Sequence, residues 1–118
     1  MAFSLTAEQT AVREAVREFG ENEIEPLGTE CDREKRYPAE LMEQAAQYDL
    51  IAPEVPEKYG GGGMTEFEAV LAIETVGQVC PDTANALYGQ SMVAPRAVDM
   101  FGSEVVKQRY LPPLCEGE

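Results

Sequence analysis

The sequence predicts an all-α domain, an antiparallel bundle of about five helices. Apolar residues recur at spacings of three and four along most of the 118 residues, as they do on the buried side of an amphipathic helix. Two threonines are each followed three positions later by Gln or Glu, which is the capping box that opens a helix. No segment shows the alternating pattern of a half-buried strand, so we expect no sheet.

The first helix is predicted over residues 7 to about 25. Thr6 and Gln9 form a capping box, and apolar residues then repeat at helical spacing, at Val12, Ala15, Val16, Phe19 and Ile24. Proline lacks a backbone N–H and disfavours a helix interior, so we expect Pro26 to end this helix. Residues 31–37 should form a polar connection.

The second helix and the loop after it are marked by proline and glycine. Pro38 suits the first turn of a helix that ends near Asp49 and whose apolar face is Leu41, Met42, Ala45 and Ala46. Residues 50–64 contain two prolines and four consecutive glycines. This composition breaks helices and predicts a loop.

A third helix begins at the second capping box, Thr65 with Glu68. Its apolar residues are Phe67, Val70, Leu71, Ile73 and Val76. The glycine and proline of residues 77–81 are expected to close it.

Two further helices complete the expected fold. The fourth is predicted over residues 83 to about 100, with Asp82 as its cap and a kink at Pro95. Ser103 is expected to cap a short fifth helix. That helix should end at Leu111, because two prolines follow.

The charge balance excludes one class of partner. The chain has 22 Asp and Glu against 9 Lys and Arg, a formal net charge of −13. Such a surface would repel a phosphate backbone or an anionic membrane, so we expect neither as a partner. The acidity has two open interpretations, which are plain solubility and adaptation to molar salt, where charge repulsion is screened.

Cysteine usage and the N-terminal residues indicate a compartment. Cys31, Cys80 and Cys115 are far apart and include no C-x-x-C pair, so neither a disulfide framework nor a zinc site is indicated. The first residues do not form a signal peptide, and no apolar run reaches the length of a membrane span. We therefore expect a protein of the reducing cytoplasm, without membrane insertion.

The residue types offer little for catalysis. The chain has no histidine, which is the usual general base and the commonest metal ligand. Glu21, Glu23 and Glu25 point to different faces of a helix, so we expect a solvated surface and no metal site. The run Gly60–Gly63 lacks the Lys-Ser/Thr of a phosphate loop and follows no predicted strand, so a flexible turn is expected. Cys80 has no neighbouring base and is expected to be structural.

Several motifs together resemble the acyl-CoA dehydrogenase family. They occur in the family's order and cover essentially the whole chain: Phe3-Ser-Leu-Thr-Ala-Glu-Gln9, Pro38-Ala-Glu-Leu41, Val55-Pro-Glu-Lys-Tyr-Gly-Gly61, and Phe101-Gly-Ser-Glu104 with Lys107-Gln-Arg-Tyr-Leu-Pro112. The chain departs from the family pattern in a longer glycine run and in Val106, which replaces a glutamine. The resemblance implies that residues 1–118 are the family's N-terminal helical domain. Residues 111–118 resemble the junction before the middle β-domain, so that domain and the C-terminal helical domain are expected to be absent.

For a full-length protein, the resemblance implies an FAD-dependent enzyme that desaturates acyl-CoA thioesters in fatty-acid or amino-acid breakdown. Its electron acceptor would be an electron-transfer flavoprotein, and the protein would be a homo-oligomer. In the family, the other two domains hold the flavin and the C-terminal one carries the catalytic glutamate. This chain alone is therefore expected to contain no catalytic residue, to bind no cofactor and to be inactive.

Within this domain, the resemblance implies that the fourth helix forms one wall of the acyl pocket. The expected substrate-binding residues match the family's pocket-facing positions and fall at spacings of three and four: Ala84, Asn85, Tyr88 and Met92. Ordinary packing of a helix stripe is the alternative for these four residues. For the whole chain, the alternatives are a stand-alone helical module for protein association, or the same domain of an acyl-CoA oxidase or a flavin monooxygenase.

Overall fold

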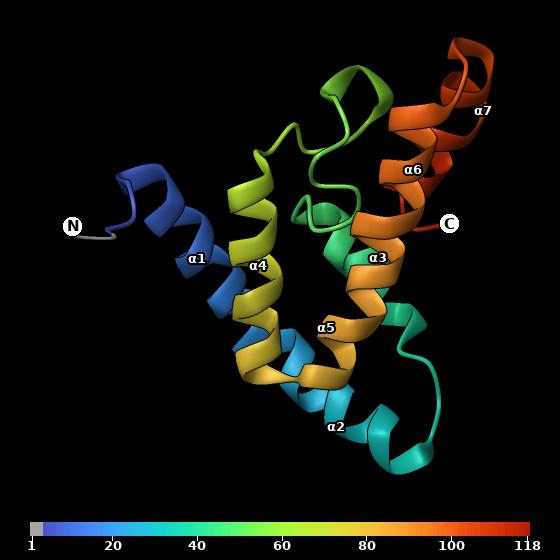
Figure 1. Ribbon diagram of the computed structural model, residues 1–118. Coiled ribbons are helices and arrows are strands. Elements are labelled where there is room, and N and C mark those ends of the chain that lie inside the picture. The colour runs from blue at the N-terminus through green and yellow to red at the C-terminus, as the bar shows by residue number, and fades with distance from the viewer. Residues whose placement is uncertain (1–3) are drawn as a thin grey trace.

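The computed structural model describes residues 4–118, so Phe3, the first residue of the first family-like motif, lies outside the described residues. Within that range every regular element is helical, and the α-helical segments join into five continuous helices (Figure 1). The predicted all-α fold class is therefore confirmed. None of the helices in the described part of the chain is long and apolar enough to cross a membrane.

The first continuous helix is longer than the sequence predicts. It consists of α1 (Ala7–Phe19), a π-helical segment η1 (Gly20–Ile24) and α2 (Glu25–Glu34). The capping box is confirmed, because the Thr6 hydroxyl accepts from the Gln9 amide at 3.2 Å and the Thr6 amide donates to the Gln9 side chain at 3.0 Å. Lys35, in the left-handed conformation, ends the helix.

The prediction that Pro26 ends this helix is wrong. In a regular α-helix the proline ring would collide with the carbonyl four residues back. Here the backbone widens directly before the proline, and the Glu25 amide donates to Gly20, five residues back. Residues 31–34 are consequently helical, and the connection is shortened to residues 35–38.

The predicted second helix and the loop after it are both present. Helix α3 (Ala39–Gln47) follows Pro38, and residues 50–64 contain only bends, turns and the 3₁₀ turn η2 (Glu57–Tyr59). This loop is part of the core rather than a loose surface segment, because six of its side chains are buried: Leu50, Ile51, Ala52, Pro53, Val55 and Tyr59. Backbone hydrogen bonds from Gly61, Gly62, Gly63 and Met64 close the loop on itself.

Helix α4 (Glu66–Val79) begins at the second capping box, which is also confirmed. The side chain of Glu68 accepts from the Thr65 amide at 2.8 Å, and the Thr65 hydroxyl accepts from the Glu68 amide at 3.3 Å. Leu71 and Val76 are buried as predicted. Phe67 and Val70, which share the predicted apolar set, are instead exposed to solvent.

The fourth continuous helix consists of α5 (Pro81–Leu87), the π-helical segment η3 (Tyr88–Val93) and α6 (Ala94–Phe101). Its cap position is Cys80, so the prediction of Asp82 is wrong by two residues; Pro81 takes the first helical position, where its missing N–H costs nothing. The sequence predicts a kink at Pro95; the structure has a second π-helical segment, which ends at Val93, two residues before that proline.

Helix α7 (Glu104–Cys115) is capped by Ser103, as predicted, but it does not end at Leu111. Pro112 and Pro113 lie inside it. The two carbonyls that lose a donor belong to Gln108 and Arg109, and both residues are exposed, so water can take the place of the missing donors.

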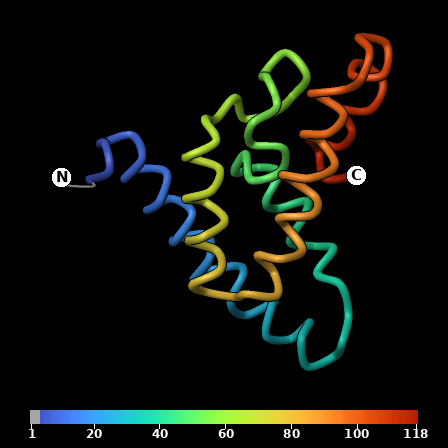
Figure 2. The backbone as a smooth tube through the Cα atoms, viewed as in Figure 1, coloured from blue at the N-terminus to red at the C-terminus, as the bar shows by residue number. Residues whose placement is uncertain are grey.

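The helices enclose one core. Helices α4 and α5 pack against each other at one end of the helical pair, α6 continues away from that contact, and α1 packs against α4 (Figures 1 and 2). The side chains at the centre come from helices and loop alike, and each is at most 1% exposed: Phe19, Ile24, Leu41, Leu50, Ile51, Leu87 and Leu111. The four residues predicted to bind substrate lie on α5 and η3.

Candidate functional site

The structure places the four predicted substrate-binding residues on two sides of one helix. Ala84, on α5, is only 8% exposed and belongs to the core cluster. Asn85 is exposed, and Tyr88 is 50% exposed. Met92 is partly exposed. Asn85 and Tyr88 can therefore meet a ligand from outside, whereas Ala84 supports the wall from within; their role in substrate binding stays a prediction.

A π-helical segment contains two of these residues, Tyr88 and Met92, whereas Ala84 and Asn85 precede it. The Ala94 amide donates to the Gly89 carbonyl, five residues back, and the Ser91 hydroxyl donates to the Leu87 carbonyl. An α-helical count through this segment is one residue short. The proline at position 95 was the available sequence signal, but it does not say whether the helix kinks or widens.

Three apolar residues beside Tyr88 were not among the predicted site residues. Val93, at the end of η3, is about half exposed, and so are Phe67 and Val70 on α4. We call Phe67, Val70, Tyr88 and Val93 the apolar face. Phe67 and Val70 lie on α4, which packs against α5, and Tyr88 and Val93 lie on η3, which continues α5. Exposed apolar groups on neighbouring elements mark binding surfaces more often than isolated ones do.

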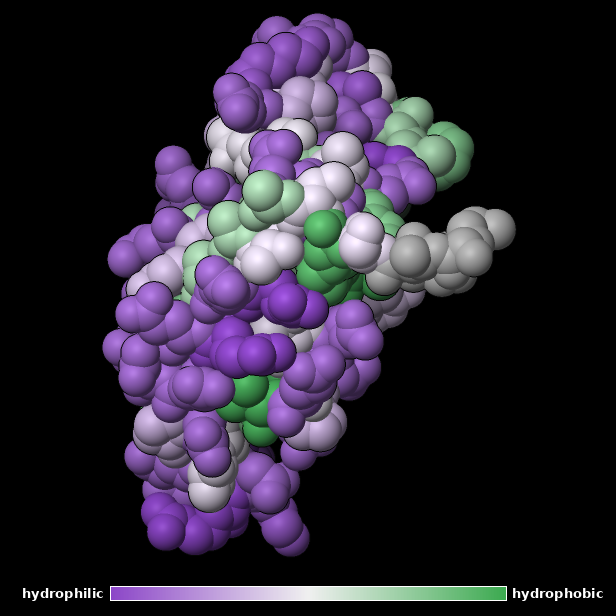
Figure 3. Space-filling model, turned by 90° about the vertical axis from the view of Figure 1, so that its left-hand side faces the viewer, coloured by the Kyte–Doolittle hydropathy of each residue, from purple (hydrophilic) through white to green (hydrophobic). Residues whose placement is uncertain are grey.

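One side of the molecule is largely polar. Figure 3 shows the side of the molecule toward α1 and α4, where hydrophilic residues cover most of the area and apolar ones form small separate patches. A hollow of about 580 Å³ lies elsewhere and includes Glu43 and Glu116 in its lining. Carboxylates there would repel a phosphate-bearing ligand.

The acidic and cysteine side chains of the described residues were considered above as possible metal ligands or nucleophiles. Among residues 4–118 no cluster of three His, Cys, Asp or Glu is placed to hold a metal, and Glu21, Glu23 and Glu25 are all exposed. Cys80 accepts a hydrogen bond from the Thr83 hydroxyl at 3.2 Å. Burial raises the pKa of the Cys31 thiol, which disfavours the nucleophilic thiolate.

The glycine run does not form a phosphate cradle. It follows the 3₁₀ turn η2, and Gly60 and Gly63 have φ values of 94° and 62°, which a glycine adopts freely. A Cβ on Gly61 would lie 2.1 Å from the Val55 carbonyl oxygen, so glycine is required there by close packing. The glycine run therefore allows the turn to pack closely against Val55.

Two of the family-like motifs meet in space. Tyr59, from the Pro-Glu-Lys-Tyr-Gly-Gly segment, donates its hydroxyl to Glu104, from the Gly-Ser-Glu segment, at 2.8 Å. Lys58 lies over the Tyr59 ring, 4.5 Å from its centroid, and Lys107 pairs with Asp99 at 3.4 Å. These contacts join the loop, α6 and α7, so the two motifs contribute to the packing of the domain.

Comparisons with known proteins agree on one family. A family model described as "Acyl-CoA dehydrogenase, N-terminal domain" matches residues 6–118. The chain is 36% identical over 118 residues to a short-chain-specific acyl-CoA dehydrogenase of Clostridium acetobutylicum, covering 100% of this chain and 31% of the relative. It is 37% identical over 117 residues to an acryloyl-CoA reductase (NADH) of Anaerotignum propionicum, covering 99% of this chain and 29% of the relative.

A solved structure gives the same result. Butyryl-CoA dehydrogenase from Megasphaera elsdenii superposes with a TM-score of 0.84 at 29% identity, covering 99% of this chain and 31% of that chain. The chain thus spans roughly a third of the length of the relatives it matches.

Proposed function

Because this chain belongs to the acyl-CoA dehydrogenase N-terminal domain family, we propose that it forms one wall of the acyl pocket in a flavin-dependent enzyme that desaturates acyl-CoA thioesters. In this proposal residues 1–118 are one domain, and a β-domain and a C-terminal helical domain complete the protein. The relatives in which this chain covers 29–31% of the length include both a dehydrogenase and a reductase. The direction of the reaction would depend on the electron acceptor and the other domains.

The observation that carries the proposal is the apolar face beside Asn85 and Tyr88. A hydrocarbon chain gains about 0.8 kcal/mol for each buried methylene, and an exposed apolar surface on rigid helices can supply that burial. The face contains no carboxylate, amine or imidazole, so we infer that its contribution is binding and orientation.

The described residues do not fit a flavin by themselves. A flavin pyrophosphate is held by glycine turns at a helix N-terminus or by clustered cations, and the net charge here is −13. The one glycine run is occupied with packing against Val55. We infer that FAD is bound by the other domains, where it would accept the hydride of the β-carbon.

The partners and the compartment follow from the family and from the cysteines. We infer an acyl-CoA substrate, an electron-transfer flavoprotein as acceptor and a homo-oligomeric enzyme. Cys31, Cys80 and Cys115 are all free thiols in the structure, which fits a reducing cytoplasm.

A stand-alone module for protein association is the second candidate, favoured by the same exposed apolar residues. Reading the gene beyond codon 118 separates the two: a coding sequence about three times as long fits the enzyme, and a stop codon there fits the module. An acyl-CoA oxidase or a flavin monooxygenase would differ only in the other domains.

The test of the acyl wall uses Tyr88, whose half-exposed ring would occupy part of the proposed acyl pocket. In a full-length enzyme carrying this domain, Tyr88→Ala should shift the optimum of kcat/KM toward longer acyl chains, by about 0.8 kcal/mol for each methylene newly buried. Tyr37→Ala is the control, because Tyr37 is similarly exposed but lies in the connection between α2 and α3. If the Tyr88 variant has the same optimal acyl-chain length for kcat/KM, the proposal that this helix forms an acyl wall is wrong.

A further inference from the structure

Arg96 joins three parts of the fold. It lies on α6, and its guanidinium donates to Glu66, in the first turn of α4, at 2.6 Å. The same guanidinium lies 3.7 Å from the carboxylate of Glu54, in the core loop of residues 50–64. The Glu54 side chain is only 8% exposed, whereas that of Glu66 is 76% exposed.

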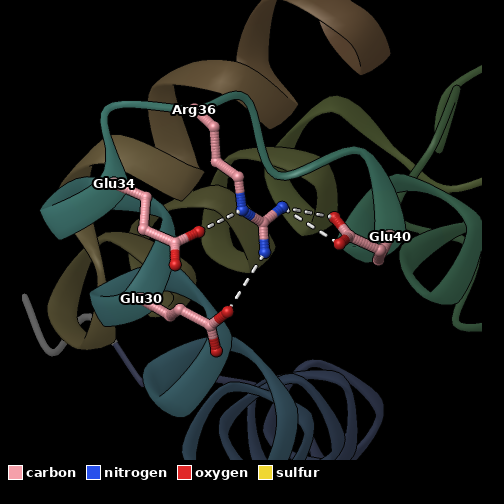
Figure 4. A network of polar contacts seen from close by, with 4 residues as sticks. All are labelled: Glu30, Glu34, Arg36 and Glu40. Carbon is pink, nitrogen blue, oxygen red and sulfur yellow. Dashed lines mark hydrogen bonds and ion pairs between the residues drawn. The ribbon is translucent and has the colours of Figure 1, made fainter.

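The second large arginine cluster of the molecule has a different character. Arg36 binds Glu34 and Glu40 at 2.9 Å and lies 3.5 Å from Glu30 (Figure 4). These three carboxylates are about half exposed and come from the end of α2 and the start of α3, close to Arg36 in sequence. Water can replace Arg36 as their partner, but it has little access to Glu54.

The position of Arg96 relates directly to the apolar face. Glu66 immediately precedes Phe67 and lies one turn before Val70, while Val93 lies one turn before Arg96. The ion pair therefore marks one end of the face. At the opposite end, only Cys80 separates α4 from α5, so the chain itself holds the two helices together there.

We propose that Arg96 is a positioning residue that fixes the separation of α4 and α6, and with it the shape of the apolar face. This inference rests on the proposed function of that face as an acyl wall. Without Arg96, the buried carboxylate of Glu54 has lost the cation beside it, and the loop and α4 are free to move away from α6.

The first experiment measures how strongly Arg96 and Glu54 are coupled in this chain. The single and double variants of a double-mutant cycle are unfolded with a chemical denaturant. Arg96→Met should raise the unfolding equilibrium constant at least about tenfold, because it leaves the nearly buried Glu54 carboxylate without a cation beside it. Arg36→Met should raise this constant less. Glu54→Gln in the Arg96→Met background should recover part of the loss, because the stranded charge is then gone. If the two arginine variants change the unfolding equilibrium constant equally and Arg96 and Glu54 show no coupling, the proposed positioning role of Arg96 is wrong.

A second readout separates positioning from general stability. Hydrogen exchange at the amides of Gly62, Gly63 and Met64 should accelerate in Arg96→Met under conditions where α1 and α2 keep their protection. Uniform acceleration over the whole chain would contradict local positioning.

The third experiment tests whether Arg96 affects substrate binding by the acyl wall, in a full-length enzyme that carries this domain. Arg96→Met should raise KM for longer acyl chains about tenfold while kcat changes little, and Arg96→Lys should restore part of this loss. If Tyr88→Ala changes the chain-length profile and Arg96→Met does not, the positioning role is wrong and the acyl wall stands. If neither variant changes the profile, the acyl wall itself is wrong and the inference falls with it.

Discussion

The hydroxyl of Tyr59 donates to the carboxylate of Glu104 at 2.8 Å, across 45 residues of sequence. Tyr59 is nearly buried in the core loop, and Glu104 opens helix α7. This hydrogen bond, with a second from Gln108, holds the pKa of Glu104 below its ordinary value. The loop and the last helix are therefore linked by a group that titrates.

The loss of stability caused by removing the Tyr59 hydroxyl should depend on pH. A carboxylate with a depressed pKa stabilises the fold above its ordinary value and loses that contribution as pH falls through the depressed value. The midpoint of thermal unfolding of Tyr59→Phe should thus lie below that of the unsubstituted chain near neutral pH, by a few degrees at most. The gap should narrow below the ordinary glutamate value of 4.5.

Tyr110→Phe is the matched control for this measurement. Tyr110 lies on the same helix as Glu104 and is exposed, so loss of its hydroxyl should leave the midpoint unchanged at every pH. A gap for Tyr59→Phe that stays constant down to pH values well below 4.5 would show that Glu104 is not the acceptor that matters.

Two glycines should respond in opposite ways to the same substitution. Gly61→Ala should destabilise the fold by about 2–4 kcal/mol, because the new methyl group would overlap the Val55 carbonyl and the backbone must move. Gly89→Ala should stabilise it by about 0.5–1 kcal/mol, because Gly89 is in a helix and a Cβ there meets nothing within 4 Å. Urea unfolding of both variants checks the pair, and a neutral Gly61→Ala would contradict the packing role of the glycine run.

The acidic surface should make stability depend on salt. At a net charge of −13 the folded chain repels itself, and the screening length falls from about 10 Å at 0.1 M salt to about 3 Å at 1 M. The thermal midpoint should therefore rise between these concentrations of potassium chloride. A variant with Gln at Glu21, Glu23 and Glu25 should show a shallower rise, and a flat curve for both chains would leave solubility as the only role of the acidity.

This chain alone should retain no flavin. The inference rests on the acidic charge and on the glycine run being committed to packing, and the expected result is a colourless preparation without dehydrogenase activity. Flavin titration followed by absorbance and fluorescence checks it. Stoichiometric FAD bound to residues 1–118 would overturn the division of labour between the domains.

Three helix starts were predictable because each carries its own local signal, whereas the start of α5 at Cys80 has no side-chain cap and was misplaced. Thr6, Thr65 and Ser103 cap helices in the structure as the sequence predicts, since a cap is made by a side chain and the amides two or three residues later. Helix ends at proline were not predictable, because the outcome depends on distant packing. Beyond Pro26 the helix is held by its burial against α5, where a Cβ on Gly28 would lie 2.8 Å from the Cys80 sulfur.

The site was only partly predictable for a similar reason. The sequence identifies the helix that contains Asn85 and Tyr88, and both reach its surface. It does not reveal that Ala84 lies in the core or that Phe67 and Val70 are exposed. An apolar residue shows only that it avoids water somewhere, and which side of a helix is covered depends on what else packs there.

The two π turns have a consequence for comparing this chain with others. Each closes its hydrogen bonds over one residue more than an α-turn does, so it behaves locally like the insertion of a single residue. Residues after Val93 consequently face directions that an uninterrupted helix would give to their predecessors. A relative whose helix lacks the turn needs a one-residue gap opposite Tyr88–Val93, and functional roles should be transferred across it from two anchors, Leu87 before the turn and Gly102 after it.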